Sequence, residues 1–331
     1  LRPVQSGGSD GLIDLGVMDF SAVRKVQRLL ASRFADALAR DDQPAAASEL
    51  TRLAGLVPLM DWQPLLIGQL MGLTGDARLF ALMRLALDAE PSAEMLDTLE
   101  QIVVRRAKER PPFKTIIEGE RLFGRDQVCL AFSDVERVRS GKVVLDPWSG
   151  PVTGRVGTLE ENLAALDAHW DWVLAAFETP PGAEGPPQPA SDLATMRSSL
   201  FNPKRFLTAL RVRELDLRGL AIRIALERFR LREGRYPASL ADAPDVSALS
   251  AATGLPTPMI DPLSGRPISY RLIDPASDTF GRGYLLYVWG ADNQDDHGIA
   301  AKNDRVYPQD VLIGKGLPGR DFVLNRPGTI P

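Results

Sequence analysis

Four aspartates near the end of the chain are spaced closely enough to share one cation. Asp292, Asp295, Asp296 and Asp304 fall within thirteen residues. Crowded carboxylates repel one another, so the segment is either a solvated acidic loop or a site for a hard cation with oxygen ligands, of which calcium is typical. The spacing is not that of an EF-hand, because His297 stands where that loop needs glycine and Asn303 where it needs glutamate. The residues by themselves leave both alternatives open.

The chain offers little for acid–base or nucleophilic catalysis. It has two histidines, and His169 lies in a helical run beside tryptophans, where we expect a partly buried polar residue. The sequence contains no G-x-S-x-G elbow, H-E-x-x-H zinc helix or P-loop. Glu118 and Glu120 could form the carboxylate pair of a glycoside hydrolase, but helical positions two apart face different directions. We therefore expect a protein that is not an enzyme, with a helical-domain hydrolase as an alternative.

Composition excludes several classes of protein. Apolar residues make up 44% of the 331 residues and charged residues 25%, as in ordinary globular proteins. With 39 basic and 43 acidic side chains the formal charge is −4, so we expect no nucleic-acid partner. The single cysteine, Cys129, excludes a disulfide framework within one chain, and we expect it to be a small buried hydrophobe.

No uninterrupted apolar run of about 18 residues is present, so membrane contact would need a segment that is absent from this chain. The sequence begins at Leu1 rather than at methionine, which leaves open whether an anchor precedes it.

Local patterns divide the chain into four segments. Residues 1–20 read as an extended lead-in, and residues 21–178 as an all-α domain because apolar residues recur at steps of three and four. Residues 179–191 hold five prolines and two glycines, which predicts an extended linker. Residues 192–331 then form a second domain. The first 200 residues carry an excess of acidic side chains and the remainder an excess of basic ones.

The last segment predicts one long helix, at about 203–232, followed by short strands. The strands are expected at 268–273, 284–289 and 311–313, where apolar residues alternate between turns. The arginines of the helix are interpreted as a solvated face, the alternative being contact with an acidic partner such as the acidic N-terminal half. The predicted fold class is α+β: an all-α domain, a Pro-rich linker, and a long helix packed on a small antiparallel sheet.

Several short motifs follow one another in a particular order in this segment. The helix ends in Glu233-Gly234-Arg235-Tyr236-Pro237, Asp261-Pro262 follows with Gly265, Pro267 and Tyr270, and the sheet ends in the run Leu286-Tyr287-Val288-Trp289-Gly290-Ala291-Asp292. Over roughly residues 205–310 this order resembles the soluble domain of the major pseudopilin of type II secretion and of related type IV pilin-like proteins. In that family the helix packs on the sheet, and the loop after the sheet binds calcium. The family's apolar N-terminal half-helix is not in this chain.

The resemblance implies a pilin-like head stabilised by calcium. It implies that Asp292 and Asp304 are side-chain ligands and that the carbonyl of Trp289 is a third ligand. Asp295 and Asp296 are the alternative ligands.

Together these features predict a non-enzymatic structural or interaction protein of a bacterial cell envelope, periplasmic or extracellular. Its helical domain would bind a protein partner. The first alternative is a component of a type II secretion or type IV pilus-like apparatus whose membrane helix is missing from this chain.

Overall fold

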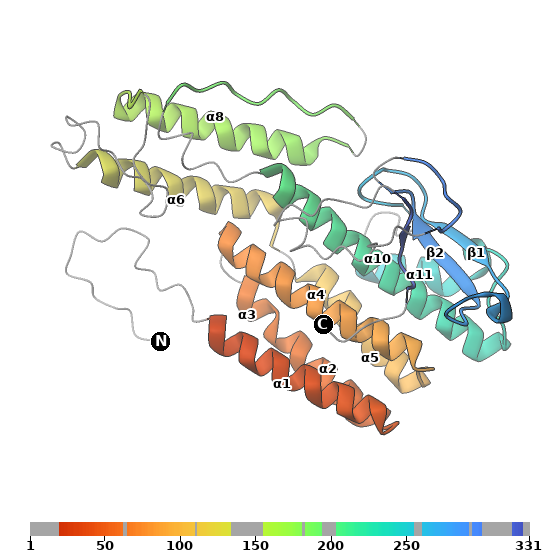
Figure 1. The fold of residues 1–331 in the computed structure, drawn as a ribbon. Coiled ribbons are helices and arrows are strands. Elements are labelled where there is room, and N and C mark those ends of the chain that lie inside the picture. Colours follow the sequence, from red (N-terminus) through yellow and green to blue (C-terminus); the bar gives the residue numbers. More distant parts are fainter. Residues whose placement is uncertain are drawn as a thin grey trace. The chain divides into compact units, whose positions relative to one another are not determined.

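The computed structural model describes residues 20–61, 65–109, 111–133, 155–180, 183–193, 203–254, 260–290, 293–299 and 320–326. The chain forms two compact units (Figure 1). The larger, here called the main unit, takes in residues 20–63, 67–110 and 204–331; the smaller, here called the hairpin unit, includes residues 111–203.

The main unit contains a helical part and a sheet part. Its helices are α1 (Phe20–Ala39), α2 (Gln43–Leu56), α3 (Pro58–Asp61), α4 (Leu66–Asp88, almost all of it in this unit), α5 (Ala93–Lys108), α10 (Pro203–Glu233) and α11 (Pro244–Thr253). Its strands are β1 (Ser269–Leu272), β2 (Tyr284–Val288) and β3 (Phe322–Val323). The hairpin unit contains α6 (Phe113–Ser133) and α8 (Leu159–Glu178).

Local signals explain where several helices begin. The side chain of Asp42 accepts a hydrogen bond from the amide of Ala45 and so caps α2, and Ser92 caps α5 through the amide of Met95. Helix α4 is continuous through Thr74 and Gly75, although glycine is unfavourable inside a helix. Gly75 instead serves packing, because a Cβ at this position would lie within 3.3 Å of side chains from α1, α3 and Val57.

Helix α10 is the central element of the main unit. Apolar side chains are buried on all its faces between Leu215 and Phe229, as expected for a helix that is covered on every side. One continuous apolar cluster joins them to α1, α2, α4 and α5 and to Leu286 and Val288 of β2. Figure 1 shows α10 between α4–α5 and the sheet. The structure therefore groups the chain differently from the sequence-based division into residues 21–178 and 192–331.

The structure groups α10 with the N-terminal helices because arginines of α10 pair with carboxylates of α4. Arg213, Arg218 and Arg223 are each at most 5% exposed, so the interpretation of a solvated face is wrong for them. Arg213 pairs with Asp76 and Arg223 with Asp88 of α4, the latter at 2.7 Å. The alternative, contact with the acidic N-terminal half, is confirmed within the chain itself.

The sheet has the strand order β1-β2-β3, with antiparallel pairing throughout. Tyr270 faces Leu286 across β1 and β2, and Val288 faces Phe322 across β2 and β3. The predicted strand at 311–313 lies outside the described residues. The predicted α+β class, largely helical with a small antiparallel sheet, is confirmed at this level.

In the hairpin unit, α6 and α8 pack on each other. The rings of Phe113 and Phe177 stack at 3.9 Å, and Arg125 pairs with Asp167 at 2.5 Å. Residues 183–193, which include most of the predicted linker at 179–191, are extended, and the indole of Trp172 donates a hydrogen bond to the carbonyl of Pro186 at 2.8 Å. This segment therefore runs back along α8 instead of spanning free solvent.

Glycine at position 72 of α4 should prove necessary for packing. A Cβ there would lie 2.5 Å from the Cβ of Asp61, whose carboxylate binds Arg106 at 2.8 Å. Alanine is normally favoured over glycine inside a helix by about 1 kcal/mol, but we expect Gly72→Ala to lower the free energy of unfolding. Gly55→Ala, in α2 with no atom within 4 Å of the new Cβ, should raise it. Urea denaturation of both variants measures the difference, and a gain of stability in both would contradict the packing described here.

Candidate functional site

The acidic loop directly follows β2, the central strand of the sheet. Of the predicted ligands, Trp289, Asp295 and Asp296 lie in the described part of the chain, whereas Asp292 and Asp304 lie outside it. The guanidinium of Arg266 covers the ring of Trp289, 4.2 Å from its centroid.

Asp295 is tied to the sheet. Its Oδ1 accepts hydrogen bonds from the hydroxyl of Tyr287 at 3.2 Å and from the amide of His297 at 2.9 Å. Asn293 and His297 have positive φ angles of 63° and 59°, a backbone region that asparagine and histidine tolerate better than most side chains. The loop therefore turns tightly and keeps Asp295 beside β2.

A further carboxylate, Asp321, reaches this loop from the residue before β3. It is fully buried, and its Oδ2 accepts a hydrogen bond from the amide of Gly298 at 2.7 Å. Its Oδ1 has no hydrogen-bond partner among the described residues. We did not predict Asp321 from the sequence. The one feature that could have indicated it is its position directly before the short apolar strand β3.

The carboxylates of Asp295 and Asp296 lie close enough to that of Asp321 to affect its pKa. Burial raises the pKa of Asp321, whereas hydrogen bonds from the amides of Gly298 and Asp296 act in the opposite direction. The negative charges of Asp295 and Asp296 raise the pKa further. A hard cation would relieve this repulsion and supply the partner that Oδ1 lacks. These oxygens therefore fit the chemistry of calcium, although no three His, Cys, Asp or Glu side chains in the described part of the chain are already arranged around a metal position.

The motifs of the predicted pilin-like segment join the sheet to α10. The hydroxyl of Tyr236 donates to Glu227 of α10 at 2.8 Å, and that of Tyr270 donates to the carbonyl of Pro237 at 2.7 Å. Asp261 accepts from the amides of Leu263 and Ser264, which closes the turn before β1. Tyr236, Tyr270 and Asp261 therefore have structural roles around the sheet.

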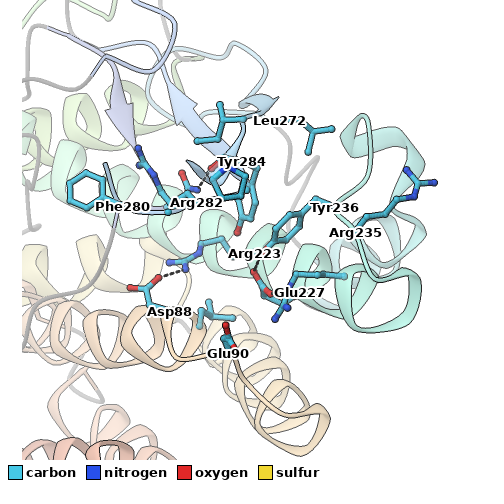
Figure 2. Close-up of a pocket in the computed structure, with 17 residues that line it drawn as sticks. Asp88, Glu90, Arg223, Glu227, Arg235, Tyr236, Leu272, Phe280, Arg282 and Tyr284 are labelled. Atoms are coloured by element: carbon cyan, nitrogen blue, oxygen red, sulfur yellow. Dashed lines mark hydrogen bonds and ion pairs between the residues drawn. The ribbon is translucent and has the colours of Figure 1, made fainter. Parts of the chain in front are cut away.

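A second site is a cavity of about 740 Å³ within the main unit (Figure 2). Its walls come from the end of α4, the C-terminal half of α10 and the connection between β1 and β2. The charged and aromatic side chains that line it are Asp88, Glu90, Arg223, Glu227, Arg230, Arg235, Tyr236, Phe280, Arg282 and Tyr284. Apart from Arg235 and Tyr236, the residues of this cavity belong to none of the motifs found in the sequence, because they are far apart along the chain.

The catalytic candidates do not come together. His169 is 4% exposed, its pKa is lowered by burial, and it packs against Trp170 and Trp172, as expected for a buried polar residue. Glu120 accepts a hydrogen bond from the amide of Leu66, whereas the side chain of Glu118 is 44% exposed, so the two carboxylates form no pair. Cys129 is exposed, and the expectation that it is buried is wrong.

Comparisons of the chain with models of protein families, with curated proteins and with solved structures found no match. Among the helices in the described ranges, none is both long enough and apolar enough to span a membrane.

Replacement of Asp321 should change how stability depends on pH. The pKa of this carboxyl is raised in the folded state, so without a cation its contribution to stability falls as the pH rises above about 4, where the unfolded chain loses its proton. We expect the free energy of unfolding of Asp321→Asn, relative to the parent chain, to increase between pH 4 and pH 7 in the presence of a chelator. Denaturation curves across this range test it, and a difference that is constant or falls with pH would contradict the account.

Proposed function

We propose that this chain is a non-enzymatic interaction protein of a bacterial cell envelope, with a pseudopilin-like head whose acidic loop binds calcium. The observation that carries the proposal is the buried Asp321, whose unpartnered oxygen lies beside the loop that holds Asp295 and Asp296. A buried carboxylate without a full set of donors is costly, and a cation bound there would offset that cost.

The order of elements supports the pilin-like part of the proposal. A long helix, α10, is followed by three antiparallel strands, and the acidic loop leaves the sheet after β2. Tyr236, Tyr270 and Asp261 sit at the corners between helix and sheet and are held there by the hydrogen bonds given above. In this interpretation Asp292, Asp304 and the carbonyl of Trp289 complete the set of calcium ligands.

Exposed apolar side chains in the hairpin unit favour a protein partner. In the described part of this unit, several large apolar side chains of α6 and α8 are exposed: Leu122, Leu130, Leu159 and Phe177. We assign partner binding to this unit because helices α1, α2, α4 and α5, which were included in the predicted binding domain, contribute to the apolar core around α10.

Membership of a type II secretion or type IV pilus-like apparatus is the second candidate, favoured by the same combination of long helix and sheet. It requires an apolar membrane helix in the precursor. Mass spectrometry and N-terminal sequencing of the native protein distinguish the candidates, since an apparatus component would carry about 20 apolar residues ahead of this sequence.

Calcium should raise the melting temperature of the full chain, and a chelator should reverse the effect. A ligand that binds only the folded form adds about 2.7 kcal/mol at a hundredfold excess over its dissociation constant. We expect Asp321→Asn to melt higher than the parent chain in chelator, because the buried charge is gone, and to lose most of the response to calcium.

The matched control is Asp36→Asn, which removes a carboxylate from an exposed pair with Arg40 on α1 and should keep the full response. Differential scanning calorimetry in millimolar calcium, in chelator and in millimolar magnesium makes the comparison. Identical melting curves of the parent chain in calcium and chelator would exclude the calcium site.

A further inference from the structure

We propose that the cavity between α4, α10 and the β1–β2 connection binds a single carboxylate attached to an aromatic or apolar body, and that this ligand is the C-terminal residue of a peptide. Arg223 is the group that receives the carboxylate. This cavity is distinct from the proposed calcium site, because none of the predicted calcium ligands lines it.

Arg223 is a buried cation, and some of its N–H donors have no hydrogen-bond partner among the described residues. Its side chain is 4% exposed and its Nη2 donates to Asp88 at 2.7 Å. The guanidinium also lies beside the hydroxyl of Tyr284, yet its Nε and Nη1 have no hydrogen-bond partner among the described residues. Unpartnered donors of a buried charged group are energetically costly, so an acceptor from a ligand would stabilise this arrangement.

Of the other arginines on the cavity wall, Arg230 pairs with Glu227 and Arg282 with Asp278, so we expect the cavity to favour a ligand with a single negative charge. Glu227 is occupied, because it accepts from the hydroxyl of Tyr236 and from Nε of Arg230. Asp88 and Glu90 lie along the same side of the cavity in Figure 2 and would repel a doubly charged phosphate more than a carboxylate. Arginine donors suit carboxylate oxygens well.

The remaining walls suit an aromatic or apolar body. Tyr236 and Tyr284 meet edge to face with ring centroids 4.7 Å apart, and both line the cavity. Phe280 and Leu272 line it as well, and they are 48% and 44% exposed, so their apolar surface is available to a ligand. A cavity of about 740 Å³ is within the range of sites that enclose a small molecule or a peptide end.

The cavity is open to solvent on one side, which favours a peptide C-terminus over a free small acid as the ligand. The exposed Leu272, Phe280 and Arg235 border the cavity, so a chain could leave it towards solvent while its terminal carboxylate reaches Arg223. The preceding residues of the peptide would then contact these three side chains.

Isothermal titration calorimetry with the full chain tests the proposal using four probes: the peptide Gly-Gly-Gly-Gly-Phe, its C-terminal amide, 3-phenylpropionate and inorganic phosphate. We expect saturable binding of the free-acid peptide and at least about tenfold weaker binding of the amide, the loss typical of one charge-assisted hydrogen bond. Binding of 3-phenylpropionate as tight as that of the peptide would overturn the peptide assignment. Equal binding of the amide, tighter binding of phosphate, or no binding of the peptide would overturn the carboxylate site.

Two variants localise the binding. Arg223→Lys keeps a positive charge near Asp88 but removes the guanidinium donors, and it should weaken peptide binding at least about tenfold. Phe280→Ala removes a half-exposed wall whose ring lies under the guanidinium groups of Arg282 and Arg326, 5.0 and 5.9 Å from its centroid. It should also weaken binding, which keeps the test valid if the Arg223 variant folds poorly. Arg40→Gln, on the surface of α1, should bind like the parent chain. Unchanged affinity in Phe280→Ala and in a folded Arg223→Lys would overturn the proposal.

Discussion

A single carboxylate, Asp76 of α4, lies between two arginines in the interior of the main unit. Arg106 of α5 donates to it at 2.9 Å, and Arg213 of α10 pairs with its other oxygen. Burial by itself would raise the pKa of Asp76, but the charges of Arg213 and Arg106 outweigh it and hold that pKa below its ordinary value. Arg106 is itself fully buried and also binds Asp61 of α3 at 2.8 Å. Four helices are thereby held by one network of buried charges.

Both candidate sites depend on the position of α10 that this network fixes. One wall of the cavity is the stretch of α10 that carries Arg223 and Glu227, and Asp88, at the end of α4, completes the ion pair. The sheet is joined to the same helix through Tyr236 and the apolar cluster, so the acidic loop is positioned by α10 as well. Buried ion pairs are costly to desolvate, and here they determine which acidic residues of α4 and α5 face which arginines of α10.

The sequence predicted the elements better than their assembly. The long helix and the strands β1 and β2 follow from local patterns of apolar residues. The proline-rich segment suggested a domain boundary, but composition does not reveal that Arg213 and Asp76, 137 positions apart, pair in the core. The cavity and Asp321 were missed for the same reason, since long-range pairing brings their residues together. Arginines on a helix look alike in sequence whether they face solvent or buried carboxylates.

Amide hydrogen exchange of the full chain carrying Asp76→Asn tests most directly whether this network holds the helices and the sheet together. Removing one partner of a buried ion pair typically costs about 3–5 kcal/mol, which should lower the protection of slowly exchanging amides more than about a hundredfold. We predict that peptides from α4, α5 and β2 lose protection together in Asp76→Asn, whereas Asp36→Asn leaves all three unchanged. Retained protection of β2 with loss confined to α4 and α5 would contradict it, because the sheet and its helix would then be stable without the network.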